Sequence, residues 1–206
     1  MKLIKQSFSL LGPIFLILCL VSGLGFMACS DDDDDEASLI QPLEEGNTWT
    51  YIDEDEQWTM TVNGTQDVDG TETKRVDVNW LDTETYYSDF WTYFFKNHED
   101  GMYYYGTEYQ GDIDTTSPRL WVKYPVSDGE SFVDGWGNTY RVMSLSEQVT
   151  VPAGTFTCIK FECRNDDGNL YTYEYWAPNV GYIKSLDINS NGTTFDDDLL
   201  TSYSLN

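Results

Sequence analysis

The sequence predicts an all-β, mainly antiparallel fold: a single curled sheet that forms a half-barrel or open barrel, with few short helices. Seven Asn-Gly or Asp-Gly pairs lie between residues 63 and 192, and glycine accepts the positive φ that hairpin turns require. The segments between these pairs are rich in Thr, Val and aromatic residues, which favour strands. No segment carries a long apolar stripe at helical spacing.

The expected strands follow one another at short intervals. They cover residues 47–54, 57–63, 73–80, 89–95, 101–108, 119–124, 138–151, 154–164, 170–177, 181–188 and 199–205. In the first, Trp49 and Tyr51 alternate with threonines, which predicts one buried face. Residues 89–95 carry aromatic side chains on both faces, so this strand is covered twice or faces a groove. Short helices remain possible at 81–88 and 194–200.

The N-terminal residues have the layout of a secretory signal. Lys2 and Lys5 precede an apolar run over residues 10–26, which ends near the small residue Ala28. Glycine and proline within the run, and the lack of a basic cluster after it, argue against a transmembrane anchor. We therefore expect residues 1–28 to be a signal peptide.

A lone cysteine follows this run. The tetrapeptide Phe26-Met27-Ala28-Cys29 resembles a bacterial lipobox, although Phe26 stands where leucine is commonest. The resemblance implies that Cys29 is acylated by the lipoprotein processing machinery and anchors the chain in a lipid bilayer. Each buried methylene of an acyl chain contributes about 0.8 kcal/mol, so more than one chain gives stable anchoring.

An acidic run comes next, and residues 29–38 are expected to form a disordered tether. The run resembles the export signal of surface-exposed lipoproteins of Bacteroidota, and its residues are Ser30, Asp31, Asp32, Asp33, Asp34 and Asp35. The resemblance implies that export machinery reads the run, and that the protein lies on the outer membrane and faces the cell exterior.

Composition limits the partners of the remaining chain. The formal net charge of the whole sequence is −25, and binding of nucleic acid or of anionic membrane surfaces requires clustered Lys and Arg that this chain lacks. Aromatic residues make up 16%, which excludes a disordered acidic polymer. Residues 39–206 are long enough for one domain with a core of its own.

Two cysteines remain after Cys29. On one strand, Cys158 and Cys163 would lie about 16 Å apart on opposite faces, whereas a disulfide needs Cα atoms within about 7 Å. We expect buried free thiols rather than a disulfide, a metal site or a redox site.

Catalytic and metal-binding patterns are weak. His98 is the single histidine and stands in a polar, turn-like stretch, where a solvated side chain is expected. Paired carboxylates cannot be identified among so many acids. Residues 67–70 and 165–168 lack the spacing of a calcium loop, and Asp196, Asp197 and Asp198 could chelate an ion only weakly, so turns and a solvated acidic run are favoured. We expect no cofactor, no metal and no enzymatic activity.

Three motifs carry a further resemblance. The segments 45–51 (EGNTWTY), 149–161 (VTVPAGTFTCIKF) and 174–185 (EYWAPNVGYIKS) are similar to a recurring trio in exported bacterial lipoproteins of unassigned function. These proteins resemble the lipoprotein-carrier superfamily, which implies a curved half-barrel sheet. Physically, Pro152 with Gly154 and Pro178 with Gly181 predict two tight corners.

Binding is the favoured function class. Exposed tyrosines and tryptophans would give flat, rigid platforms for a glycan or a partner protein. The candidates are Trp91, Tyr93, Tyr103, Tyr105, Tyr171, Tyr173, Tyr175 and Trp176, although many of them are needed for the core. The alternatives are a carrier, with a lipid or other hydrophobic ligand in the half-barrel, and a structural surface protein.

Overall fold

The computed structural model describes residues 39–53, 56–82, 88–189 and 191–206. The signal peptide at 1–28, the acylation site Cys29, the export signal Ser30 to Asp35 and the tether up to residue 38 lie outside the described residues. Those expectations therefore stay predictions.

The described residues form one antiparallel sheet of twelve strands. The strands are β1 (Thr48–Asp53), β2 (Glu56–Val68), β3 (Thr71–Asp82), β4 (Ser88–His98), β5 (Gly101–Tyr109), β6 (Asp112–Lys123), β7 (Ser131–Val133), β8 (Thr139–Val151), β9 (Gly154–Arg164), β10 (Leu170–Ala177), β11 (Gly181–Ile188) and β12 (Thr194–Ser204). Their order in the sheet is β6-β5-β4-β3-β2-β1-β12-β11-β10-β9-β8-β7. The predicted fold class is confirmed.

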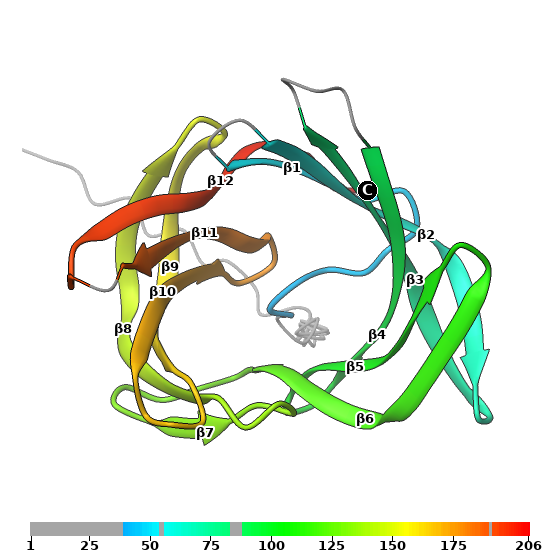
Figure 1. The fold of residues 1–206 in the computed structure, drawn as a ribbon, viewed down its shortest axis with the longest axis horizontal. Helices are drawn as coiled ribbons and strands as arrows, with labels where there is room; N and C mark the ends of the chain where they lie inside the picture. Colours follow the sequence, from blue (N-terminus) through cyan, green and yellow to red (C-terminus); the bar gives the residue numbers. More distant parts are fainter. Residues whose placement is uncertain (1–38, 54–55, 83–87, 190) are drawn as a thin grey trace, which may run out of the picture. The chain divides into compact units, whose positions relative to one another are not determined.

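The sheet curls until its two edges approach each other, as the ring of strands in Figure 1 shows. The edge strands β6 and β7 are consecutive in sequence. Beside them, the Gly135 amide donates a hydrogen bond of 2.8 Å to the Leu120 carbonyl oxygen. A Cβ atom at Gly135 would lie 2.2 Å from the Cβ of Arg119, so only glycine permits this approach. The sheet is nearly closed into a barrel.

Some local predictions are wrong. The possible helix at 194–200 lies in strand β12, because its residues pair with β11 and β1 instead of folding on themselves. At 81–88, residues 81–82 end β3 and Ser88 begins β4, while 83–87 lie outside the described residues. Strand β7 was not predicted, and Gly64 sits at a bulge within β2 rather than in a turn. The described residues contain no helix, so none there could cross a membrane.

The core lies mainly on the inner face of the sheet. Trp49 and Tyr51 are fully buried, as their alternation predicts. The Trp49 indole N–H donates to the Val180 carbonyl oxygen at 2.7 Å, and the Tyr51 hydroxyl donates to the Tyr182 carbonyl oxygen at 2.9 Å. Since both bonds join β1 to the β10–β11 hairpin, they hold the curl of the sheet.

Strand β4 is covered on both faces, as its aromatic sequence suggests. Phe95 belongs to the main core. Its neighbour Phe94 packs with Val68 and Tyr105 in a small second cluster. The two cysteines, Cys158 and Cys163, are free and buried, which confirms the prediction that they are not joined. Burial raises the pKa of the Cys158 thiol to about 12.

The segment before β1 crosses the inside of the ring (Figure 1, blue). At one side, the Leu39 amide donates to Asn179 Oδ1 at 2.9 Å. At the other, the Asn97 side chain donates to the Gln41 carbonyl oxygen at 2.9 Å. Gly181 makes room for this segment, because a Cβ there would lie 3.0 Å from Gln41 Cγ and Cδ. The segment therefore brings the Gln41 side chain into the interior.

Candidate functional site

A cavity of about 290 Å³ lies inside the ring of strands. Nine strands and the segment before β1 contribute to its walls. Seven lining residues are aromatic: Trp58, Trp80, Phe95, Trp121, Tyr140, Trp176 and Tyr182. The other five are Gln41, Met60, Met102, Glu174 and Asp198. This acidic aromatic cavity combines an apolar wall with a few convergent polar groups, which is the usual composition of a small-molecule site.

Asp198, on β12, is the first of two carboxylates in the cavity. Its Oδ1 accepts a hydrogen bond of 2.5 Å from the Trp58 indole N–H. Its Oδ2 accepts one of 3.3 Å from the Tyr182 hydroxyl. Burial, with smaller effects from the charges of Asp197 and Asp53, raises the pKa of Asp198 to about 7. The cavity therefore holds a carboxyl group that titrates near neutral pH.

Glu174, on β10, is the second carboxylate. Its Oε1 accepts from the Tyr140 hydroxyl at 3.0 Å, and its Oε2 accepts from the Trp176 indole N–H at 2.9 Å. Burial raises the pKa of Glu174 as well. The Trp176 and Tyr182 rings lie 5.3 Å apart, so these two rings connect Glu174 to Asp198 along one wall.

Neither carboxylate has a cationic partner among the residues that the structure describes. Basic side chains pair with acids elsewhere: Arg75 with Glu108, Lys123 with Glu130, Arg164 with Glu162 and Lys184 with Asp196. No Lys, Arg or His is among the lining residues of the cavity. Desolvation of an ionised carboxylate is costly unless a charge of opposite sign compensates it.

Gln41 adds an unused donor. It is 1% exposed, and its Nε2 has no hydrogen-bond partner in the described structure. A buried amide N–H without an acceptor costs about 1–3 kcal/mol. Such groups are rare in native proteins and call for an explanation, such as a ligand or a water molecule.

A second cavity of about 370 Å³ adjoins the first, because Trp121 and Tyr140 line both. Trp136 lines it too and is 43% exposed. Its ring meets the Trp121 ring edge-on at 5.2 Å, and the Arg119 guanidinium lies over it at 5.6 Å. Trp136 thus stands between solvent and the aromatic interior, close to where the sheet edges meet.

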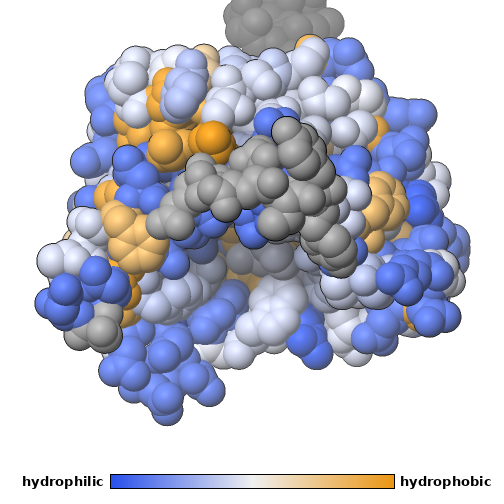
Figure 2. Space-filling model, turned by 45° about the horizontal axis from the view of Figure 1, so that its top comes forward, coloured by the Kyte–Doolittle hydropathy of each residue, from blue (hydrophilic) through white to orange (hydrophobic). Residues whose placement is uncertain are grey.

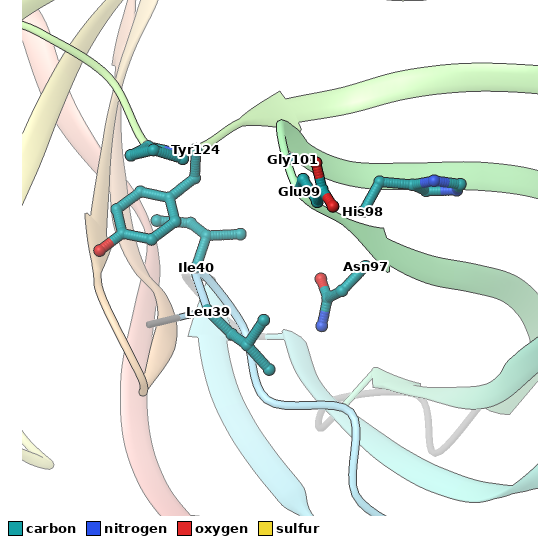
Figure 3. Close-up of a pocket in the computed structure, with 8 residues that line it drawn as sticks. Leu39, Ile40, Asn97, His98, Glu99, Gly101 and Tyr124 are labelled. Carbon is teal, nitrogen blue, oxygen red and sulfur yellow. The ribbon is translucent and has the colours of Figure 1, made fainter. Parts of the chain in front are cut away.

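A third pocket, of about 360 Å³, has a different character (Figure 3). Leu39 and Ile40 of the crossing segment face the end of β4 across it, and Tyr124 stands beside them. Asn97 points into this space, whereas the His98 side chain points away from it. Its walls are mostly apolar, and neither Glu174 nor Asp198 lines it.

The sequence-predicted aromatic residues are spread over the molecule. Trp176 lines the acidic aromatic cavity, and Tyr93 lines the neighbouring one. Trp91 stacks on Tyr109 at 4.1 Å, and Tyr171 packs against the main core. The remaining candidates lie elsewhere: Tyr103 and Tyr105 in the second cluster, and Tyr173 and Tyr175 under the Lys160 ammonium group. The eight residues do not form one platform.

The single histidine lies at the end of β4. His98 Nε2 is 2.8 Å from the Tyr105 hydroxyl, and its ring meets Tyr103 edge-on at 4.7 Å. The residue is exposed, as predicted, but it has this specific partner. No cluster of metal-ligating side chains occurs in the part of the chain that the structure describes.

Sequence reasoning missed most of the cavity. Glu174 stands in the strongly aromatic strand YTYEYW, and a lone acid in such a strand is a signal of a buried carboxylate. Asp198 adjoins the apolar pair Leu199 and Leu200, although two further aspartates precede it. Gln41 carries no such signal, because its burial depends on the crossing segment and on Gly181.

The outer surface offers no comparable site on the face in Figure 2. Hydrophilic side chains dominate that face, and apolar ones form small separate patches. Scattered apolar residues of this kind are normal on protein surfaces.

Comparison with known proteins finds a family match to part of the chain and crystal structures of low sequence identity. A family model described as DUF3108-like matches residues 136–200, and no curated protein matches the chain. One similar crystal structure is that of a protein from Parabacteroides distasonis, provisionally described as a lipoprotein. It has 15% identity and a TM-score of 0.48, over 82% of this chain and 100% of the other. Another comes from Bacteroides fragilis and is provisionally described as an exported protein with a YmcC-like fold. It has 13% identity and a TM-score of 0.50, with the same coverage.

Proposed function

We propose that the chain is an exported lipoprotein of the outer membrane that acts as a non-catalytic binding module. Its ligand site is the acidic aromatic cavity. The observation that carries this proposal is a set of three polar groups that line the cavity: two half-buried carboxylates, which lack cationic partners among the described residues, and the buried Gln41 amide, which lacks an acceptor. A bound small molecule would supply the missing interactions.

A purely structural interior would be built differently. Apolar side chains of similar volume fill a core without the desolvation cost that half-buried carboxylates carry. Sites that a protein retains at a cost to its stability are typically functional. The aromatic walls suit flat or ring-shaped ligands, because ring faces give large contact areas with little loss of side-chain freedom.

The proposed location depends on the N-terminal motifs. The lipobox-like tetrapeptide ending at Cys29 and the acidic run after it support anchoring and export. The Bacteroides fragilis protein of similar fold is described as exported, which agrees with this location. Only the acidic run supports the surface-facing orientation.

A carrier of a lipid or other hydrophobic molecule is the second candidate. The pocket beside Leu39, Ile40, Tyr124 and Pro125 favours it, because its walls are mostly apolar. The acidic aromatic cavity disfavours it, because acyl chains cannot satisfy buried carboxylates or an amide donor.

Native mass spectrometry of the full chain, purified in detergent from its own host, tests the proposal. We expect a discrete small mass that is released when the protein unfolds and that has the composition of a polar ligand. A lipid mass would favour the carrier instead. A ligand-free protein that also binds no component of a glycan array would contradict the binding module.

The anchor has its own test. The Cys29→Ala variant should leave the membrane fraction, because no acyl chain can be attached to alanine. Cys19→Ala is the matched control and should stay in the membrane. A Cys29→Ala protein that remains membrane-bound after its leader is removed would rule out lipid anchoring at this residue.

The orientation is tested by exchanging residues 31–35 for asparagine. This variant should remain acylated but should lose sensitivity to protease added outside the cell. Unchanged sensitivity would contradict the role of the acidic run as an export signal.

A further inference from the structure

The geometry points to a small polyhydroxy amine as the ligand of the acidic aromatic cavity. This inference rests on the proposed function and adds the chemical class of the ligand: an organic ammonium group together with hydroxyl or ether oxygens. Three features of the cavity lead to it: the missing positive charge, the arrangement of the rings and the unused amide donor.

The first feature is charge. Glu174 and Asp198 line the same cavity and lie on one wall, linked through the Trp176 and Tyr182 rings. Each carboxylate oxygen accepts one neutral donor, and carboxylate oxygens have room for further donors. The described lining residues supply no cation. An ammonium group on the ligand would compensate the negative charge of these half-buried carboxylates and donate to their remaining lone pairs.

The second feature is the rings. Four of the seven aromatic rings that line the cavity are tryptophans: Trp58, Trp80, Trp121 and Trp176. The face of an aromatic ring carries partial negative charge and attracts cations, most strongly for tryptophan. The chain uses this interaction on its own cations elsewhere, with Lys160 over Tyr173 at 4.9 Å. In the cavity, the rings surround two carboxylates rather than a lysine of the chain. The faces of these rings therefore add to the preference of the cavity for a cationic ligand.

The third feature is Gln41. Its buried Nε2 donor needs an acceptor, and an ammonium group has none. The ligand must therefore carry an oxygen atom in addition to its positive charge. A fatty acid fits poorly, because its carboxylate would be repelled by Glu174 and Asp198. A neutral sugar would satisfy Gln41 but would leave the carboxylates uncompensated.

The test is titration calorimetry of the full chain in detergent with two matched probes. Glucamine is an open-chain amino polyol, and sorbitol is the same polyol with a hydroxyl in place of the ammonium group. At about pH 8, aliphatic amines are charged and Asp198 is above its pKa. We expect glucamine to bind at least about tenfold more tightly than sorbitol, as for a charge pair formed in a desolvated site.

Three variants assign the preference to these residues. In the Glu174→Gln/Asp198→Asn protein, the preference for glucamine should fall to about one, since both carboxylates that line the cavity have been neutralised. Asp196→Asn is the matched control, because Asp196 pairs with Lys184 on the surface, and it should leave the preference unchanged. Gln41→Leu should weaken the binding of both polyols but keep the preference for the amine. Circular dichroism checks that each variant is folded.

The outcomes separate the two proposals. Equal affinity for glucamine and sorbitol would overturn the amine inference and leave the binding module in place. A preference for glucamine that survives in the double variant would also overturn it, because the charge would then lie elsewhere. Binding of neither probe would overturn the inference, and a ligand-free protein in native mass spectrometry would then remove the support for the cavity as a binding site.

Discussion

Asp196 and Asp198 lie two residues apart on β12 in opposite environments. The Asp196 side chain is 54% exposed, and its Oδ1 accepts from the Lys184 ammonium group at 2.7 Å. Asp198 lines the aromatic interior, and its hydrogen-bond donors, Trp58 and Tyr182, are neutral. The outer acid is thus compensated by the chain itself. The inner acid is not, although the same strand carries both.

The difference shows how one sheet serves two purposes. On the outside, an acid next to a lysine keeps the strand soluble and costs little. On the inside, Glu174 and Asp198 lie next to aromatic rings, where an ionised carboxylate is poorly solvated and lowers stability. The proposed function accounts for this arrangement, because a ligand bound in the interior would compensate the two carboxylates at some cost to the stability of the ligand-free protein.

The largest expected effect comes from removing an interior ring. Trp58 is 8% exposed and stacks on Tyr51 and Trp80. Trp58→Ala should lower the free energy of unfolding by about 3–5 kcal/mol, as large-to-small core changes do. The matched control is Trp136→Ala, at a 43% exposed tryptophan, for which we expect about 1 kcal/mol or less. Urea denaturation measures the free energy of unfolding of both variants. Equal losses would contradict the proposed difference between interior and exterior tryptophans.

The next effect is the pH dependence of stability. The pKa of Asp198 is raised to about 7 in the folded protein, against about 3.9 in an unfolded chain. The folded state therefore binds more protons between these values, so the contribution of Asp198 to stability is fully present below about pH 4 and is lost as the pH rises to about 7. We expect a loss of about 1–3 kcal/mol from this group, since one pKa unit corresponds to about 1.4 kcal/mol and partial solvation reduces the effect.

Other groups near the two carboxylates shape this profile. Asp53 and Asp197 face Asp198, while Asp134 and Asp187 act on Glu174. All are acids, so their charges act in the same direction. Asp198→Asn should make the pH dependence of the free energy of unfolding clearly flatter, as measured by urea denaturation at several pH values. A variant with the same slope as the natural chain would show that Asp198 does not cause it.

The smallest effect is expected at the outer acid. Asp196→Asn removes a surface ion pair, and such pairs contribute about 0–1 kcal/mol. We expect a change in the free energy of unfolding within about 0.5 kcal/mol, with no effect on its pH dependence between pH 5 and 8. A larger loss would mean that the Lys184 pair is structurally important and would weaken the contrast within β12.

The fold was largely predictable from the sequence, because its signals are local. Asp69-Gly70 forms a turn with both residues at positive φ, and the alternation of Trp49 and Tyr51 gives the buried face of β1. The prediction was wrong for residues 194–200, where charge and a short apolar pair concealed a strand. Residues 194–200 form a strand because they pair with β11 and with β1, and β1 is distant in sequence.

The site was much less predictable. Its twelve lining residues come from nine strands and a crossing segment, so no spacing in the sequence groups them. Of the aromatic candidates, Trp176 reaches the acidic aromatic cavity, because strand parity and the bulge between Tyr175 and Trp176 set its direction. Trp58 and Trp80 are direct cross-strand partners, but this register became visible only once the pairing was known.

The most direct test of the central claim is the stability of the Glu174→Gln/Asp198→Asn protein, measured by urea denaturation without ligand. If the chain leaves these carboxylates uncompensated, the variant should be about 1–3 kcal/mol more stable than the natural chain at pH 8. The gain should shrink strongly at about pH 5, where Asp198 is mostly protonated in the folded protein. A variant that is less stable at both pH values would contradict the account, because the carboxylates would then be part of what holds the fold together.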